Sequence, residues 1–167
     1  TLQPIKRFDL DSAIIFSDIL MIPYALGQKV NFVKDEGPKL DKFNLDVFLS
    51  NDEKSYSQKL NPIYKAIEIT RKNLQKNKSL ISFVGAPWTL LIYMLGIKKG
   101  KSEIDLTKLK KFEDSIDAII MELIKYICIH IKNQINAGAD VVQIFDSWAG
   151  LIPQNKIKDF CYVPNAN

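Results

Sequence analysis

Three short apolar runs divide the chain and predict three buried strands. The runs cover Ala13–Asp18, Ser79–Val84 and Ala139–Phe145, and each leads into small or polar residues. Uninterrupted apolar runs rich in Ile, Val and Phe are typical of strands covered on both faces, as in parallel sheets. We therefore expect these runs to form the centre of the fold.

Two long segments between the runs predict helices. Asn61 is a suitable N-cap and Pro62 fits the first helical position, so we place one helix from here to about Lys78. A second helix is predicted over about 113–136, because isoleucines recur there at helical spacing. Gly138 stands where a glycine commonly ends a helix.

Shorter segments complete the predicted order of elements. Residues 29–33 alternate polar and apolar side chains and are followed by turn residues at 35–38, which predicts a short hairpin. Residues 88–96 favour a short helix, and another helix is expected to begin near Pro153. The segment 41–58 is polar and poorly periodic.

The order of strands and helices predicts an α/β fold. Short connections from helix to strand indicate parallel strands joined by right-handed crossovers. Because the carboxyl ends of parallel strands share one edge, where sites are assembled, Asp18, Gly85 and Ser147 should converge in space. This pattern favours neither a closed (β/α)8 barrel nor an open sheet.

Composition excludes several classes of function. The net charge is +4, but 21 of the 23 basic residues are Lys dispersed among Asp and Glu, which predicts a solvated surface and no nucleic-acid partner. No apolar stretch reaches membrane-spanning length without charges. Cys128 and Cys161 lack the spacing of zinc ligands, and no glycine-rich phosphate-binding motif follows a strand. We therefore expect no membrane contact and no metal.

Asp18 is the residue that this pattern leaves unexplained. At the end of a buried strand its carboxylate needs a hydrogen-bond donor or a cation, because desolvating a charge is costly. A structural donor and a ligand meet this need equally well, and the residues alone give the two about equal weight.

Three separated segments of the chain stand out together. They are LQPIKRFDLDSAIIFSDILMIPYALGQKVNFVKDEGPKL over 2–40, ISFVGAPWTLLIYMLG over 81–96, and GADVVQIFDSWAGLIP over 138–153. In this order they resemble the uroporphyrinogen decarboxylase family. Their number and order make the resemblance specific, and it spans essentially the whole chain. Any one segment alone would also suit the wider superfamily of cobalamin-related methyltransferases.

The resemblance implies a (β/α)8 TIM barrel, of which residues 1–167 form one partial domain, truncated at both ends and covering about strands 2 to 4 with their helices. It also implies a cytoplasmic homodimer without cofactor or metal. The reaction that the resemblance implies is removal of the four acetate carboxyl groups of uroporphyrinogen III to leave coproporphyrinogen III. The family's arginine-rich segment and site histidine would lie outside the chain, so we expect this piece to be inactive alone.

The family match assigns roles to four residues. Asp18 would accept hydrogen bonds from the pyrrole N–H groups and stabilise the cation formed when a pyrrole carbon is protonated. Tyr93 would bind an acetate carboxylate near the reacting ring, so Asp18 and Tyr93 are implied as catalytic. Phe83 and Ser147 would bind substrate with them, by lining the cleft and by donating to a carboxylate. Without the resemblance, the two aromatic residues also suit a core and Ser147 suits a turn cap.

The remaining residues near the strand ends are expected to be structural. Asp146 and Trp148 flank Ser147 and should point elsewhere, because side chains alternate along a strand. Gly85 and Ala86 would leave room for the macrocycle. His130 is expected to interact with the helix dipole or solvent. Two other functions stay open: a methyltransferase using zinc or cobalamin, and a non-catalytic module that binds tetrapyrroles or forms dimers.

Overall fold

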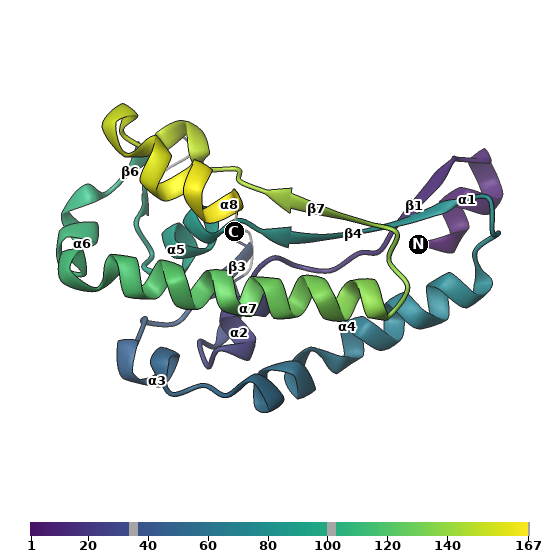
Figure 1. Cartoon of the computed structure of the whole chain (residues 1–167), viewed down its shortest axis with the longest axis horizontal. Coiled ribbons are helices and arrows are strands. Elements are labelled where there is room, and N and C mark those ends of the chain that lie inside the picture. The colour runs from purple at the N-terminus through teal and green to yellow at the C-terminus, as the bar shows by residue number, and fades with distance from the viewer. Residues whose placement is uncertain (34–36, 100–102, 167) are drawn as a thin grey trace.

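A parallel three-stranded sheet forms the centre of the molecule. The computed structural model describes residues 1–33, 37–99 and 103–166. The strands are β1 (Ser12–Ile14), β4 (Ser79–Gly85) and β7 (Val141–Phe145), in the spatial order β1-β4-β7. Strands β4 and β7 point toward the same end of the molecule, where helices α5 and α8 lie (Figure 1). The predicted parallel α/β arrangement is confirmed.

Two long helices pack on one face of this sheet, α4 (Glu53–Asn73) and α7 (Ile116–Asn136). Helix α5 (Pro87–Met94) follows β4 directly, with Pro87 in its first turn. The other elements are short: α1 (Leu2–Phe8), α2 (Met21–Ala25), β2 (Val30–Val33), β3 (Gly37–Leu40), α3 (Leu45–Leu49), β5 (Lys98–Lys99), β6 (Glu103–Ile104), α6 (Leu106–Lys110), η1 (Glu113–Ser115), η2 (Ala149–Leu151), η3 (Gln154–Lys156), η4 (Lys158–Tyr162) and α8 (Val163–Ala166).

The two faces of the sheet differ in burial. Leu80, Ser82 and Val84 alternate along β4 and are buried on the side of the helices. Ile81 and Phe83 point to the other face and are only partly covered. The expectation of strands covered on both faces is therefore wrong for the described residues, which place helices over one face only.

Strand β1 is shorter than predicted. It ends at Ile14 and not at Asp18, although the backbone N–H of Ile15 still donates to the carbonyl of Ile81 at 2.9 Å. Ile14 is 58% exposed and Phe16 is 90% exposed, so alternate side chains of this apolar run face outward. An apolar run alone did not reveal which of its faces is open.

The N-cap of helix α4 lies nine residues before the predicted one, Asn61. Asp52 is the true N-cap, since its carboxylate accepts the N–H of Ser55 at 2.9 Å. Pro62 lies inside the helix, where it removes one backbone donor. Buried Tyr56 and Leu60 hold the first turns against the core and outweigh this loss.

Other predicted elements are confirmed. Strands β2 and β3 pair as the expected antiparallel hairpin, while part of its predicted turn, 34–36, lies outside the described residues. Gly138 follows α7 with φ of 109°, a conformation that suits glycine. The region after Pro153 is helical, in short pieces of different type. Among the described helices, none is long and apolar enough to cross a membrane.

Candidate active site at the carboxyl ends of the strands

The predicted site residues lie toward one edge of the sheet. Asp18 comes four residues after β1, Tyr93 lies on the helix that follows β4, and Ser147 comes two residues after β7. Phe83 lies on β4 itself, two residues before its end. Because the three strands are parallel neighbours, these positions share the carboxyl edge of the sheet.

Asp18 is exposed, so the prediction of a buried carboxylate is wrong. Its Oδ1 atom accepts the backbone N–H of Leu20 at 2.8 Å, and its carbonyl oxygen accepts the N–H of Met21 at 3.1 Å. These bonds close the turn that leads into α2. An ionised carboxylate has further lone pairs, so the geometry leaves Asp18 able to accept hydrogen bonds from a ligand.

Ile19 connects this turn to the end of β4. A Cβ atom built on Gly85 would lie 3.1 Å from the Cβ of Ile19 and 2.8 Å from Leu90 Cδ2. Because Gly85 has no side chain, Ile19 and Leu90 can pack closely against its backbone. Ala86 is fully buried. The expectation that these two residues leave room for a macrocycle is replaced by a packing role.

Phe83 lies on the open face of the sheet and contacts Phe145. The two rings meet edge to face with their centroids 5.5 Å apart. Strand register pairs Gly85 with Phe145, which places Phe145 on the same face as Phe83. Sequence reasoning did not select Phe145, although its position at the end of β7, opposite a glycine, is a usable signal.

Tyr93 and Ser147 are connected through Trp148. The ring of Tyr93 is half-buried and meets the Trp148 ring edge to face at 6.1 Å between centroids. Ser147 is exposed and lies directly beside Trp148. The structure therefore brings Tyr93 close to the turn that carries Ser147.

Asp146 and Trp148 have structural contacts, as expected. The carboxylate of Asp146 accepts the Thr89 hydroxyl at 2.7 Å, and the buried Trp148 backbone carbonyl accepts the Trp88 indole N–H at 3.0 Å. Burial, with a hydrogen bond to the Asp146 carboxylate, raises the pKa of the Cys161 thiol. These contacts fix the turn after β7.

His130 does not lie in the environment expected for it. It is 3% exposed, between α7 and α4, and its Nδ1 atom lies 3.0 Å from the Tyr64 hydroxyl. Burial lowers the pKa of His130 to about 4. The prediction of a dipole or solvent interaction is wrong, because the helix turns this side chain into the layer between the helices.

The arginines of the chain lie elsewhere. Arg71 donates to the Asp140 carboxylate at 2.7 Å and to the carbonyl of Lys78 at 3.0 Å, both at the amino ends of β4 and β7. Arg7 lies on α1 and stacks over Phe8. Within the described ranges, no group of three or more His, Cys, Asp or Glu side chains is placed to hold a metal ion.

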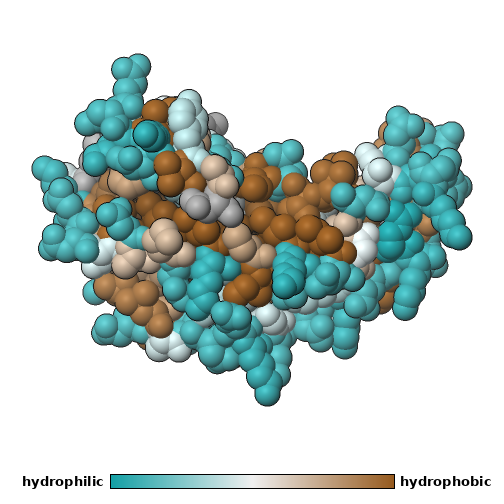
Figure 2. Space-filling model, in the orientation of Figure 1, coloured by the Kyte–Doolittle hydropathy of each residue, from teal (hydrophilic) through white to brown (hydrophobic). Residues whose placement is uncertain are grey.

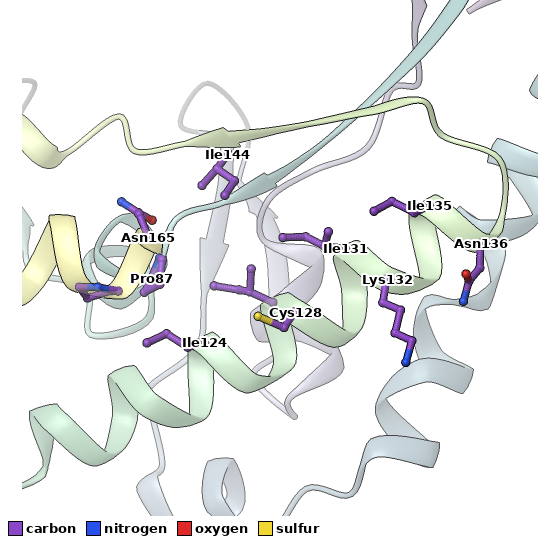
Figure 3. A pocket seen from close by; sticks show the side chains of 11 residues that line it. Pro87, Ile124, Cys128, Ile131, Lys132, Ile135, Asn136, Ile144 and Asn165 are labelled. Atoms are coloured by element: carbon purple, nitrogen blue, oxygen red, sulfur yellow. The ribbon is translucent and has the colours of Figure 1, made fainter. Parts of the chain in front are cut away.

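An apolar groove of about 380 Å³ lies on the opposite side of β7. Side chains of α7 point into it and Ile144 of β7 points toward them, whereas Lys132 points away (Figure 3). The same region forms a band of apolar surface between α7 and the strands (Figure 2). Ile144 alternates with Phe145, so this groove is separate from the site on the open face.

Comparison with known proteins identifies the family. The family model described as uroporphyrinogen decarboxylase matches residues 1–167. The chain belongs to the uroporphyrinogen decarboxylase family. A curated uroporphyrinogen decarboxylase from Orientia tsutsugamushi (strain Ikeda) is 44% identical over the whole chain, and one from Rickettsia bellii is 42% identical over 98% of it. The chain spans about half the length of these relatives, 49% and 48%.

A solved structure shares the fold. The methyltransferase from Methanosarcina mazei superposes with a TM-score of 0.70 over 98% of this chain and 49% of its own, at 15% sequence identity. At that identity the likeness concerns the fold alone. Membership of the uroporphyrinogen decarboxylase family rests on the sequence matches.

Proposed function

We propose that the complete gene product containing residues 1–167 decarboxylates uroporphyrinogen III to coproporphyrinogen III. The observation that carries this proposal is the family match over the whole chain, together with relatives of that name at 42–44% identity. The contacts at the carboxyl edge of the sheet agree with it. An exposed carboxylate, a half-buried tyrosine and an exposed serine hydroxyl occur there on three successive strand ends.

The three strands are proposed to be consecutive strands of a (β/α)8 barrel, about the second to the fourth. Sequential strands are spatial neighbours and parallel, and α4 and α7 cover one face only. The open face carries mostly apolar side chains, which suits the interior of a barrel filled by layers of side chains. On this view 1–167 is one partial barrel domain, and the cleft lies at its carboxyl edge.

In the proposed reaction a proton adds to a pyrrole carbon, which puts positive charge on the ring. The bond between the acetate methylene and its carboxylate then breaks, its electrons neutralise the ring and CO₂ leaves. A second proton converts the methylene to a methyl group as the ring regains its aromatic form with loss of the first proton. Each acetate is thereby replaced by a methyl group, without an oxidant or reductant.

Asp18 is proposed to stabilise the cation in this step. Its carboxylate is held by the Leu20 N–H, so it is already oriented before substrate arrives. A preorganised anion beside a developing positive charge in a dry cleft is worth several kcal/mol. The same oxygens would accept the pyrrole N–H groups, which orients the macrocycle.

Tyr93, Ser147 and Phe83 are proposed to bind the substrate. The hydroxyl groups of Tyr93 and Ser147 would donate to acetate carboxylates, and the Phe83 ring would contact the macrocycle. Phe145 joins this group because it packs against Phe83 on the same face. The complete protein is further proposed to be a cytoplasmic homodimer, which rests on the family resemblance.

The test is a turnover assay on the complete gene product. Purified protein is incubated anaerobically with uroporphyrinogen III, and the products are oxidised and separated by number of carboxyl groups. Conversion to the four-carboxyl product supports the proposal. Binding of the substrate without loss of any carboxyl group would contradict it and favour a non-catalytic tetrapyrrole-binding module.

A further inference from the structure

The turn that carries Ser147 is bonded to helix α5 on both sides of that serine. On one side, the N–H of Ala86 donates to the carbonyl of Phe145 at 2.8 Å. On the other, the indole of Trp88 donates to the carbonyl of Trp148 at 3.0 Å. Ser147 itself stays exposed between these attachments.

Thr89 makes two further bonds to the same turn. Its hydroxyl donates to the Asp146 carboxylate at 2.7 Å and accepts the backbone N–H of Trp148 at 3.2 Å. The side chain is fully buried, and a hydroxyl is the smallest group that can donate and accept at once. Thr89 therefore holds the two residues that flank Ser147.

The same helix carries Tyr93, one turn beyond Thr89. The Tyr93 ring packs against Trp148, whose backbone Thr89 and Trp88 hold in place. Trp88 is itself stacked on Phe160, with ring centroids 5.1 Å apart and an interplanar angle of 12°. The relative position of Tyr93 and Ser147 is thus set by a small buried cluster.

Asp146 is directed away from its exposed neighbour by this cluster. Besides the Thr89 hydroxyl, its carboxylate accepts the Asn165 amide at 3.4 Å and a hydrogen bond from Cys161. A free carboxylate beside Ser147 would repel an anionic substrate. Engaging Asp146 with three donors leaves the hydroxyl of Ser147 as the group presented to solvent.

We propose that Thr89 is a positioning residue, which sets the separation of Tyr93 and Ser147 and keeps the Asp146 carboxylate out of the site. This inference rests on the proposed function, in which those two hydroxyl groups bind substrate carboxylates. A buried threonine acting through its neighbours affects catalysis without touching the substrate.

The test compares three variants of the complete gene product. Thr89→Val keeps the shape and removes both hydrogen bonds, whereas Thr89→Ser retains them. Thr70→Val is the matched control, because Thr70 is also buried but donates only to Ala66 of its own helix at 2.7 Å. Measurements are kcat and KM for uroporphyrinogen, the unfolding midpoint, and hydrogen exchange of the peptide 145–151.

Thr89→Val is expected to lower kcat/KM by about 10- to 100-fold, because misplacing binding groups by about 1 Å can cost about 100-fold. Exchange of the Trp148 amide should accelerate, and Thr89→Ser should restore both readouts. If Thr89→Val does not fold, Thr89→Ala replaces it. The inference is overturned if the Thr89 and Thr70 variants lose kcat/KM equally, or if serine fails to restore it. An unsubstituted protein that leaves uroporphyrinogen unchanged would overturn the proposed function, and with it this role.

Discussion

Acid sensitivity of the interface between α4 and α7 follows from the burial of His130. Its Nδ1 atom lies 3.0 Å from the Tyr64 hydroxyl, and Asn133 donates to that hydroxyl oxygen at 3.4 Å. In the neutral tautomer with its proton on Nε2, the Nδ1 atom accepts the Tyr64 hydroxyl proton. Protonation would put a positive charge on the buried His130 ring and make Nδ1 a donor facing the Tyr64 hydroxyl, and the described residues form no ion pair with it.

The size of the effect follows from the two pKa values. The pKa is about 4 in the fold and 6.5 for an ordinary histidine. The stability that neutral His130 contributes is fully present above pH 6.5 and is lost as the pH falls toward about 4. Linkage gives a loss of about 1.4 kcal/mol at pH 5.5 and about 3 kcal/mol at pH 4.

The assay is urea unfolding of the complete gene product across this pH range, beside the variant His130→Asn. The asparagine oxygen can occupy the place of Nδ1 and accept from Tyr64, but it does not titrate. The difference in unfolding free energy between the two proteins should shrink by about 3 kcal/mol between pH 7 and pH 4. Parallel pH profiles for the two proteins would show that the charge on His130 does not control the stability of this interface.

Three other outcomes are expected. Gly138→Ala should cost about 1–3 kcal/mol in thermal unfolding, because φ is 109° and the new Cβ would lie 2.9 Å from Arg71 Cγ; an unchanged midpoint would contradict this. Arg71→Lys should cost about 1–3 kcal/mol in urea unfolding, since one ammonium cannot replace a guanidinium that reaches Asp140 and several carbonyls. Stability equal to that of the unsubstituted protein would show that the several hydrogen bonds of the Arg71 guanidinium are not required. Tyr93→Phe should keep the ring on Trp148 and the unfolding midpoint, yet lower kcat/KM about tenfold through loss of one hydrogen bond to a charged group; unaltered kinetics would remove Tyr93 from the site.

The arrangement of strands and helices was predictable because it depends on hydrophobic patterns that extend over many residues of the sequence. Apolar runs separated by helical periodicity give parallel strands, and Gly138 ends α7 as a left-handed glycine should. The place of Ser147 just after β7 follows from the order of the strands, whereas Phe83 was selected by the family resemblance. These features depend on the spacing of apolar residues and on the order of the elements, and both can be read from a single sequence.

The errors arise where tertiary packing decides. Pro62 favours a helix start, but burial of Tyr56 and Leu60 extends α4 back to Glu53. Asp52 is a suitable N-cap residue in the sequence, but Pro62 favoured a later helix start. Asp18 was expected to be buried because an apolar run hides which face is open, and His130 was misplaced because no local pattern reveals Tyr64 across the interface.

The decarboxylation rate of Asp18→Asn in the complete gene product decides whether the Asp18 carboxylate is catalytic. Asparagine can still accept the Leu20 N–H, so the turn is retained while the negative charge is lost. Asp52→Asn is the matched control, an N-cap carboxylate that accepts the Ser55 N–H on α4. If Asp18 stabilises the cation, Asp18→Asn lowers kcat by at least about 100-fold with an unchanged unfolding midpoint, and Asp52→Asn leaves kcat intact. Equal activity of the two variants would contradict this role, since Asp18 would then be only a turn cap.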